Sequence, residues 1–117
     1  MKVKDLAGLI DARLHTGRCP EDLEITRLHV SDTMSDLIEH AAANTLLVTT
    51  LHNSQLIRVA ELMDVPAICL AGGADPQPDL LARARASGTA ILVSRTSLEE
   101  TCRLLEACRS GIEVTRT

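Results

Sequence analysis

The chain has 117 residues, of which 45% are hydrophobic and 24% charged, and its formal net charge is -4. This length and composition are typical of one globular domain with its own core. The acidic balance disfavours nucleic acid as a partner, since phosphate binding relies on clustered positive charge, and without Phe, Tyr or Trp there is no aromatic platform for bases. No stretch reaches the ~20 apolar residues of a membrane span. With no secretory signal pattern near the start, we expect a cytoplasmic protein that binds neither membranes nor nucleic acid.

The first part of the chain predicts short elements. Apolar residues at the helical spacing i, i+3, i+4, i+7 predict a helix over residues 3–10. A short strand is predicted at 12–16, a loop at 17–22, and a second strand at 25–30.

From there on, strands alternate with amphipathic helices. The later strands are predicted at 45–50, 65–71 and 90–94. Helices are predicted after 31–33, after Asn53, after Asp75-Pro76 or Gln77-Pro78, and after the overlapping capping boxes Thr96-x-x-Glu99 and Ser97-x-x-Glu100.

Two of these strands are apolar on both faces, at 46–48 and 91–93. Such runs, alternating with helices, are typical of a parallel sheet that helices cover. The sequence therefore predicts a single α/β domain over residues 1–112, with a mainly parallel sheet, helices on both faces and a flexible C-terminal tail at 113–117.

None of the four cysteines forms the C-x-x-C pair of a zinc or redox site. Cys69 lies in an apolar run and Cys102 on the apolar face of a helix, so we expect both to be buried structural thiols. Cys19 and Cys108 are expected to be more exposed, with no neighbouring base to activate them.

Ligands of open parallel sheets bind outside the carboxyl ends of the strands. The loops that follow the predicted strands hold most of the polar residues that interrupt the apolar pattern. Gly72 and Gly73 follow one strand and precede a helix, so they either hold an anion on free backbone amides or simply turn the chain through positive φ, which is the common use of glycine.

His52 follows another strand, where it either donates to a ligand or is an exposed loop histidine. Arg95 either clamps a carboxylate or phosphate or is a solvated charge. The other histidines, His15, His29 and His40, have no partner at metal-ligand spacing and are interpreted as incidental. Asp32 and Asp36 are interpreted first as helix-start charges and second as metal ligands; we predict no metal and no cofactor.

A catalytic site needs a nucleophile, a base and a group that stabilises developing charge. The sequence offers only fragments, with His52 as base, Ser94 or Thr50 as nucleophile, and glycine amides as an oxyanion site. No recognisable signature joins them, and we predict that the protein is not an enzyme.

Four segments resemble the DRTGG domain family over roughly residues 1–112. They are Val30-Ser31-Asp32-Thr33-Met34-Ser35-Asp36, Leu47-Val48-Thr49-Thr50-Leu51-His52-Asn53, Ile68-Cys69-Leu70-Ala71-Gly72-Gly73 with Asp75-Pro76, and Ile91-Leu92-Val93-Ser94 with Ser97-Leu98-Glu99. Members occur beside CBS domains, within long bacterial phosphotransacetylases, and as free-standing proteins near iron hydrogenase genes. The amino-terminal domain of HPr kinase is similar. The resemblance implies a regulatory role.

The chain departs from the motif that names this family. The Asp-Arg pair aligns with His52-Asn53 and the Thr with Ala71, so that only Gly72 and Gly73 are retained. Free-standing members often carry a Thr-His-x-Asn-like sequence at the first position, which Thr50-Leu51-His52-Asn53 approximates.

Three hypotheses follow. The first is a non-catalytic regulatory domain that binds a small ligand, a nucleotide or an acidic metabolite, through Thr50, His52, Asn53, Gly72, Gly73, Ser94 and Arg95. The second is a homodimeric docking module of a larger enzyme complex such as a hydrogenase, with no small ligand. The third is an uncharacterised enzyme.

Overall fold

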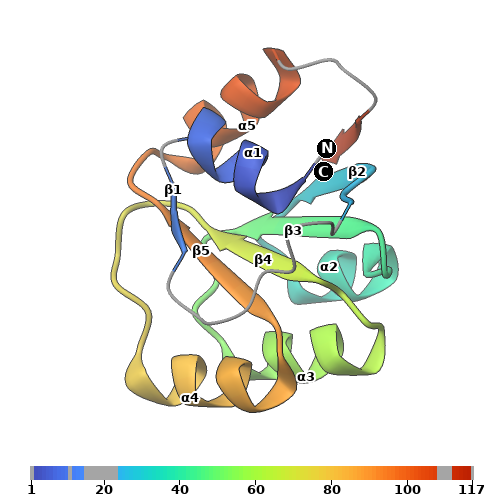
Figure 1. Ribbon diagram of the computed structural model, residues 1–117, viewed down its shortest axis with the longest axis vertical. Coiled ribbons are helices and arrows are strands. Elements are labelled where there is room, and N and C mark those ends of the chain that lie inside the picture. Colours follow the sequence, from blue (N-terminus) through green and yellow to red (C-terminus); the bar gives the residue numbers. More distant parts are fainter. Residues whose placement is uncertain (1, 11, 15–23, 108–111, 117) are drawn as a thin grey trace.

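A six-stranded sheet forms the centre of the protein (Figure 1). The computed structural model describes residues 2–10, 12–14, 24–107 and 112–116. Across the sheet the strands are β1 (Ala12–Leu14), β5 (Ala90–Ser94), β4 (Ala67–Leu70), β3 (Thr45–Thr49), β2 (Arg27–Val30) and β6 (Glu113–Arg116). Every neighbouring pair is parallel except β1 and β5, which are antiparallel. The predicted α/β fold with a mainly parallel sheet is confirmed.

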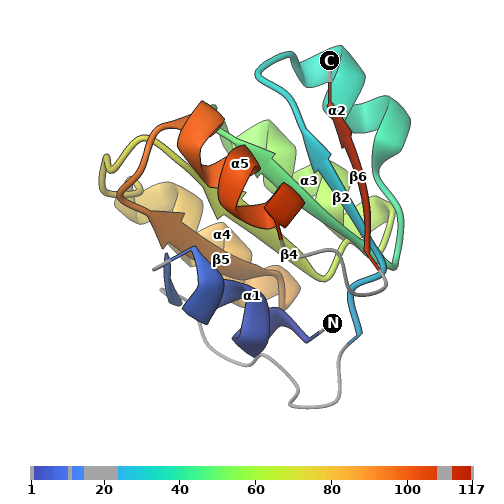
Figure 2. The ribbon, with the colours of Figure 1, turned by 90° about the horizontal axis from the view of Figure 1, so that it is seen from above.

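Helices cover both faces of this sheet (Figures 1 and 2). One face carries α2 (Met34–His40), α3 (Ser54–Leu62) and α4 (Pro78–Ser87), and the other carries α1 (Val3–Leu9) and α5 (Leu98–Ala107). Successive strand residues point to opposite faces, so each strand serves two cores. In β3, Leu47 packs on the α2–α3–α4 face, whereas Leu46 and Val48 pack on the α1–α5 face. Burial on both sides explains why the central strands are continuous apolar runs.

Three of the predicted helix starts, those of α3, α4 and α5, form as expected, whereas the start of α2 at Thr33 has no side-chain cap. Asn53 caps α3 by accepting a hydrogen bond from the Gln55 amide at 2.9 Å. Of the two candidate starts of α4, the structure has Gln77-Pro78, with Pro78 in the first turn. At α5, the second capping box supplies the cap, since Ser97 Oγ accepts from the Glu100 amide at 3.1 Å.

The C-terminal strand differs from the expectation. The sequence predicts a flexible tail at 113–117, but Glu113–Arg116 form β6, which pairs with β2 from Arg27 to Val30. Its side chains are half-buried or exposed, because β6 is the edge strand of the sheet. Such a short, polar segment lacks the apolar pattern that predicts strands, and its conformation comes from backbone pairing with β2.

Both cysteines of the described core are buried, as predicted. Cys69 and Cys102 are 0% exposed. Burial raises the pKa of the Cys69 thiol to about 12, and burial together with the neighbouring Glu106 carboxylate raises the pKa of Cys102. Cys19, Cys108 and His15 lie outside the described residues. Among the helices of the described ranges, none has the length and apolar character needed to cross a membrane.

Candidate functional site

The carboxyl ends of β2, β3, β4 and β5 lie along one edge of the sheet, which we call the carboxyl edge. The loops on it are 31–33, 50–53, 71–77 and 95–97. After β2, β3 and β4 the chain enters helices on one face, whereas after β5 it enters α5 on the other face. The adjacent strands β4 and β5 therefore form the topological switch point of the sheet, the place where ligands of open α/β folds bind.

The glycines after β4 lie at this switch point. Gly72 and Gly73 have φ values of 96° and 79°, in the left-handed region that favours glycine. Their amides donate to the end of β5 and to the loop after it, Gly73 to the Ser94 carbonyl at 3.0 Å and Gly72 to the Thr96 carbonyl at 2.8 Å. Because both amides are used within the chain, the observed role of this pair is to turn the chain and join two loops, and an anion here would be held by side chains.

These hydrogen bonds bring most of the predicted site residues together. A Cβ added to Gly73 would lie 3.3 Å from the Arg95 carbonyl oxygen, and one added to Gly72 would lie 3.7 Å from Thr50 Cγ2. Thr50, Gly72, Gly73, Ser94 and Arg95 are thus neighbours, although they come from three different loops or strand ends. Arg95 is exposed, and its side chain has no hydrogen bond or ion pair to any described residue.

The other half of the carboxyl edge is held by Asp32. Its Oδ1 accepts from the Thr50 amide at 3.0 Å and from the Thr50 hydroxyl at 2.5 Å. Asp32 therefore joins the loop after β2 to the loop after β3, and does not cap α2. Together with the glycine contacts, this bond makes the edge a continuous set of joined loops.

Ser94 lies beneath the surface of the edge. Its side chain is 0% exposed, and its hydroxyl is 2.8 Å from Thr96 Oγ1 and 3.2 Å from Thr101 Oγ1, which are themselves 2.6 Å apart. This cluster of three hydroxyls fixes the start of α5 against the end of β5.

The residues of the hypothetical catalytic fragments have different partners. The Thr50 hydroxyl donates to Asp32, the Ser94 hydroxyl belongs to the buried cluster, and Asn53 caps α3. His52 is half-buried and has no hydrogen bond or ion pair to a described residue. The candidate base His52 therefore makes no hydrogen bond with either candidate nucleophile, and the carboxylate that contacts the Thr50 hydroxyl is that of Asp32.

A groove of about 530 Å³ opens next to the carboxyl edge, between the start of α5 and the ends of β2 and β6. Its lining combines hydroxyl, acidic, apolar and cationic side chains, namely Val30, Ser31, Asp32, Thr33, Ser97, Leu98, Glu99 and Arg116. The sequence interpretation missed Arg116, because it lies in the segment expected to be a loose tail. Only the pairing of β6 with β2 brings this arginine to the edge.

A second set of polar residues was missed on the α2 side of the sheet. His29 is 1% exposed, and its Nε2 lies 2.5 Å from Asp36 Oδ2. The ring of His40 stacks on that of His29 at a centroid distance of 3.8 Å. The interpretation of His29 and His40 as incidental is wrong. The four-residue spacing of Asp36 and His40, which places them on one face of a helix, was the available signal.

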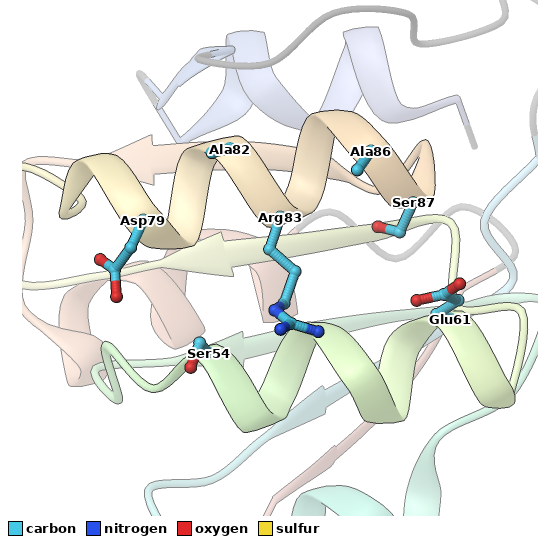
Figure 3. A pocket seen from close by; sticks show the side chains of 7 residues that line it. All are labelled: Ser54, Glu61, Asp79, Ala82, Arg83, Ala86 and Ser87. Carbon is cyan, nitrogen blue, oxygen red and sulfur yellow. The ribbon is translucent and has the colours of Figure 1, made fainter.

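Another groove, of about 550 Å³, lies between α3 and α4 (Figure 3). Figure 3 shows Arg83 extending from α4 across the groove toward α3, with Asp79 and Ser54 near one end and Glu61 and Ser87 near the other. This groove lies on the helical surface, and none of the predicted site residues lines it.

Comparison with known proteins identifies a related fold. No protein-family model matches the chain, and no curated protein matches its sequence. A crystal structure of the CBS and DRTGG domains of the regulatory region of Clostridium perfringens pyrophosphatase, complexed with the activator diadenosine tetraphosphate, is similar with a TM-score of 0.65 and 10% sequence identity. The similarity covers 89% of this chain and 45% of that one, so this protein spans about half the length of its structural neighbour. The chain shares an α/β fold with that regulatory region.

Proposed function

We propose that this protein is a regulatory domain without catalytic activity, and that it binds a small anionic ligand, a nucleotide or an acidic metabolite, at the carboxyl edge. The observation that carries this proposal is the position of the Gly72-Gly73 turn and of Arg95, which meet at the switch point between β4 and β5. At such a point the chain diverges to opposite faces of the sheet, and ligands of open α/β folds bind there.

In this proposal, side chains make the polar contacts with the ligand. Arg95 is exposed and has no partner among the described residues, so its guanidinium is available to pair with a carboxylate or phosphate. Thr50 and His52 add a hydroxyl and an imidazole from the neighbouring loop. Asn53 and Ser94 support the site indirectly, through the cap of α3 and the hydroxyl cluster at the start of α5.

The similar solved structure also supports the proposal of a regulatory role. The Clostridium perfringens regulatory region was crystallised with a nucleotide activator, and the residues around Gly72 and Gly73 resemble the DRTGG family. Both observations support the proposal that this chain acts as a DRTGG-like regulatory domain. Because the chain has no Phe, Tyr or Trp, a nucleobase would pack on aliphatic side chains or on the imidazole of His52.

A thermal-shift screen of nucleotides and acidic metabolites tests the proposal. A ligand at 100 times its Kd stabilises the folded state by about 2.7 kcal/mol. We expect at least one compound to raise the melting temperature of the unaltered chain, and Arg95→Ala to weaken its binding at least tenfold. Arg85→Ala is the matched control, because it removes the same charge from an exposed position on α4. If no compound shifts the melting temperature, or if both variants bind equally well, the proposal is wrong.

The alternative is a homodimeric docking module that joins a larger enzyme complex, such as a hydrogenase, without a small ligand. Exposed apolar side chains at the end of α3 favour it, since Leu62 is 83% and Met63 46% exposed. Light scattering distinguishes the two: a monomer mass at high protein concentration contradicts the docking module.

A further inference from the structure

The side chain of His29 connects three elements on the α2 face of the sheet. It comes from β2, and its Nε2 lies 2.5 Å from Asp36 Oδ2 on α2. Its other ring nitrogen, Nδ1, lies 2.6 Å from the Thr115 hydroxyl on β6. That hydroxyl in turn donates to the Leu28 carbonyl at 3.3 Å. His29 is thus the link between α2 and the C-terminal strand.

These three contacts need three protons. A hydroxyl has one proton to donate, a neutral imidazole has one, and a carboxylate has none. When the Thr115 hydroxyl donates to Leu28, His29 must donate from both nitrogens, to Thr115 and to Asp36. A neutral His29 and Thr115 supply only two protons between them. Nε2 then donates to Asp36 and the Thr115 hydroxyl donates to Nδ1, so the 3.3 Å contact with the Leu28 carbonyl is lost.

We propose that His29 is a proton-operated latch for β6, in which protonation of its imidazole completes the contacts that hold the C-terminal strand against β2. The doubly protonated ring donates to Thr115 on one side and forms an ion pair with the Asp36 carboxylate on the other. Loss of the proton removes the contact of the Thr115 hydroxyl with the Leu28 carbonyl, which joins β6 to β2, while His29 keeps its contacts with Thr115 and Asp36.

The charges around His29 are compatible with a single imidazolium. Asp36 and His40 face it from α2, and β3 presents the apolar Leu47 at the paired position. On the same face of β2 and β6, the next charged groups are Arg27 and Glu113, which pair with each other at 3.4 Å. Arg116 follows Thr115 directly but belongs to the opposite face, where its strand partner Val30 packs.

The direction of the pH dependence follows from proton linkage. The contact that the added proton completes exists only when β6 is docked, so in this proposal docking weakens as the pH rises. At the acid end, hydrogen bonding to His29 lowers the pKa of Asp36. That contribution is complete above the ordinary pKa of the carboxyl group and is lost as the pH falls through the lowered one. Docking of β6 is therefore strongest above the pH range in which Asp36 becomes protonated and below the range in which His29 loses its proton.

A metal ion is a poorer account of the same residues. One donor atom each of His29, Asp36 and His40 lies within 4.8 Å of the other two. However, the two imidazole rings are stacked, with an angle of 9° between their planes. A metal ion lies close to the plane of each ring that ligates it, and two stacked rings do not share such a position.

The latch has a consequence for the groove beside the carboxyl edge. Arg116, which directly follows Thr115, is the one basic residue that lines this groove. When β6 leaves β2, Arg116 leaves with it. Protonation of His29 would then control whether the groove has its cationic wall, whatever ligand occupies it.

Amide hydrogen exchange measured by NMR between about pH 5.5 and 8.5 tests the latch. After correction for intrinsic exchange rates, we expect the protection of the Glu113 and Thr115 amides, which face β2, to fall at least about fivefold as the pH rises, as for the loss of one hydrogen bond. The amides of Ile68 and Cys69 in the central strand β4 serve as an internal reference and keep their protection. Flat protection of β6 across this range contradicts the latch.

Two variants at position 115 test the mechanism without removing His29 from the core. Thr115→Val keeps the side-chain shape but has no hydroxyl, so we expect weaker β6 protection that no longer depends on pH. Thr115→Ser restores the hydroxyl and with it the pH dependence. His52→Gln is the control for another histidine and keeps the dependence. A pH dependence that persists in Thr115→Val overturns the proposal.

The protonation state can also be observed directly. Imidazole ¹⁵N shifts of His29 are expected to show both nitrogens protonated wherever β6 has its full protection. A neutral ring with β6 still fully protected contradicts the latch, as does a loss of β6 protection on addition of EDTA, which would indicate a bound metal ion.

Discussion

Asp32 Oδ1 accepts both the amide and the hydroxyl of Thr50, at 3.0 and 2.5 Å. This pair connects the ends of β2 and β3 across the carboxyl edge, one strand away from the Gly72-Gly73 turn. One carboxylate oxygen thus holds two loops that are eighteen residues apart in sequence. The position of Thr50 in the candidate site therefore depends on a residue that is not itself part of the predicted set.

Replacing Asp32 tests this connection. We expect Asp32→Ala to lower the free energy of unfolding by about 1–3 kcal/mol, because two donors of Thr50 lose their acceptor. Asp32→Asn retains an oxygen that can accept, and should lose less than half as much. Urea denaturation gives both values. Equal losses in the two variants would show that the charge matters and the hydrogen bonds do not.

Alanine substitutions at three glycines distinguish the destabilisation caused by positive φ from the destabilisation caused by steric crowding of the new Cβ. Gly73→Ala places a Cβ at φ 79° and 3.3 Å from the Arg95 carbonyl oxygen, whereas Gly88→Ala has φ 80° and nothing within 4 Å. We expect Gly88→Ala to cost about 1 kcal/mol and Gly73→Ala more than that. Gly8→Ala, on the exposed side of α1 with open space around it, should stabilise by about 0.5–1 kcal/mol. Thermal unfolding of the three variants measures the order, and a smaller loss for Gly73 than for Gly88 would contradict it.

The lowered pKa of Asp36 predicts how the free energy of unfolding changes at acid pH. Its pKa is lowered, first by the hydrogen bond to His29. Because the folded pKa lies below the unfolded one, the stabilisation is present at neutral pH and is lost as the pH falls below about 4. In Asp36→Asn the free energy of unfolding should be lower at pH 7 and should depend less on pH in the acid range. Urea denaturation of both proteins between pH 7 and about 3 measures this. Equal slopes of the free energy of unfolding against pH in the two proteins would contradict the prediction.

Thiol reactivity tests the burial of the two core cysteines. The thiolate is the reactive form, and burial raises the pKa of Cys69 to about 12 and also that of Cys102. In a variant with serine at positions 19 and 108, we expect no rapid reaction with Ellman's reagent at about pH 8 in the folded state, and reaction of both remaining thiols in denaturant. Rapid labelling of the folded variant would show that one of these sites is open to solvent.

The sequence by itself determined the fold class and the central strands. β3, β4 and β5 are apolar on both faces because helices cover both sides of a parallel sheet, and this pattern is visible without coordinates. The caps at Asn53 and Ser97 were equally visible, since a helix start uses residues that are close in sequence. The same local logic placed Gly72 and Gly73 in a turn.

Only the tertiary structure decided the strand order, the edge strand β6 and the pairing of His29. β6 is polar and short, and it is a strand because β2 offers it backbone partners from a segment more than eighty residues away. Likewise, His29 belongs to a cluster because β2, α2 and β6 converge on it. Periodicity and capping report neighbours along the chain, whereas these contacts join residues through space, so no local pattern specifies them.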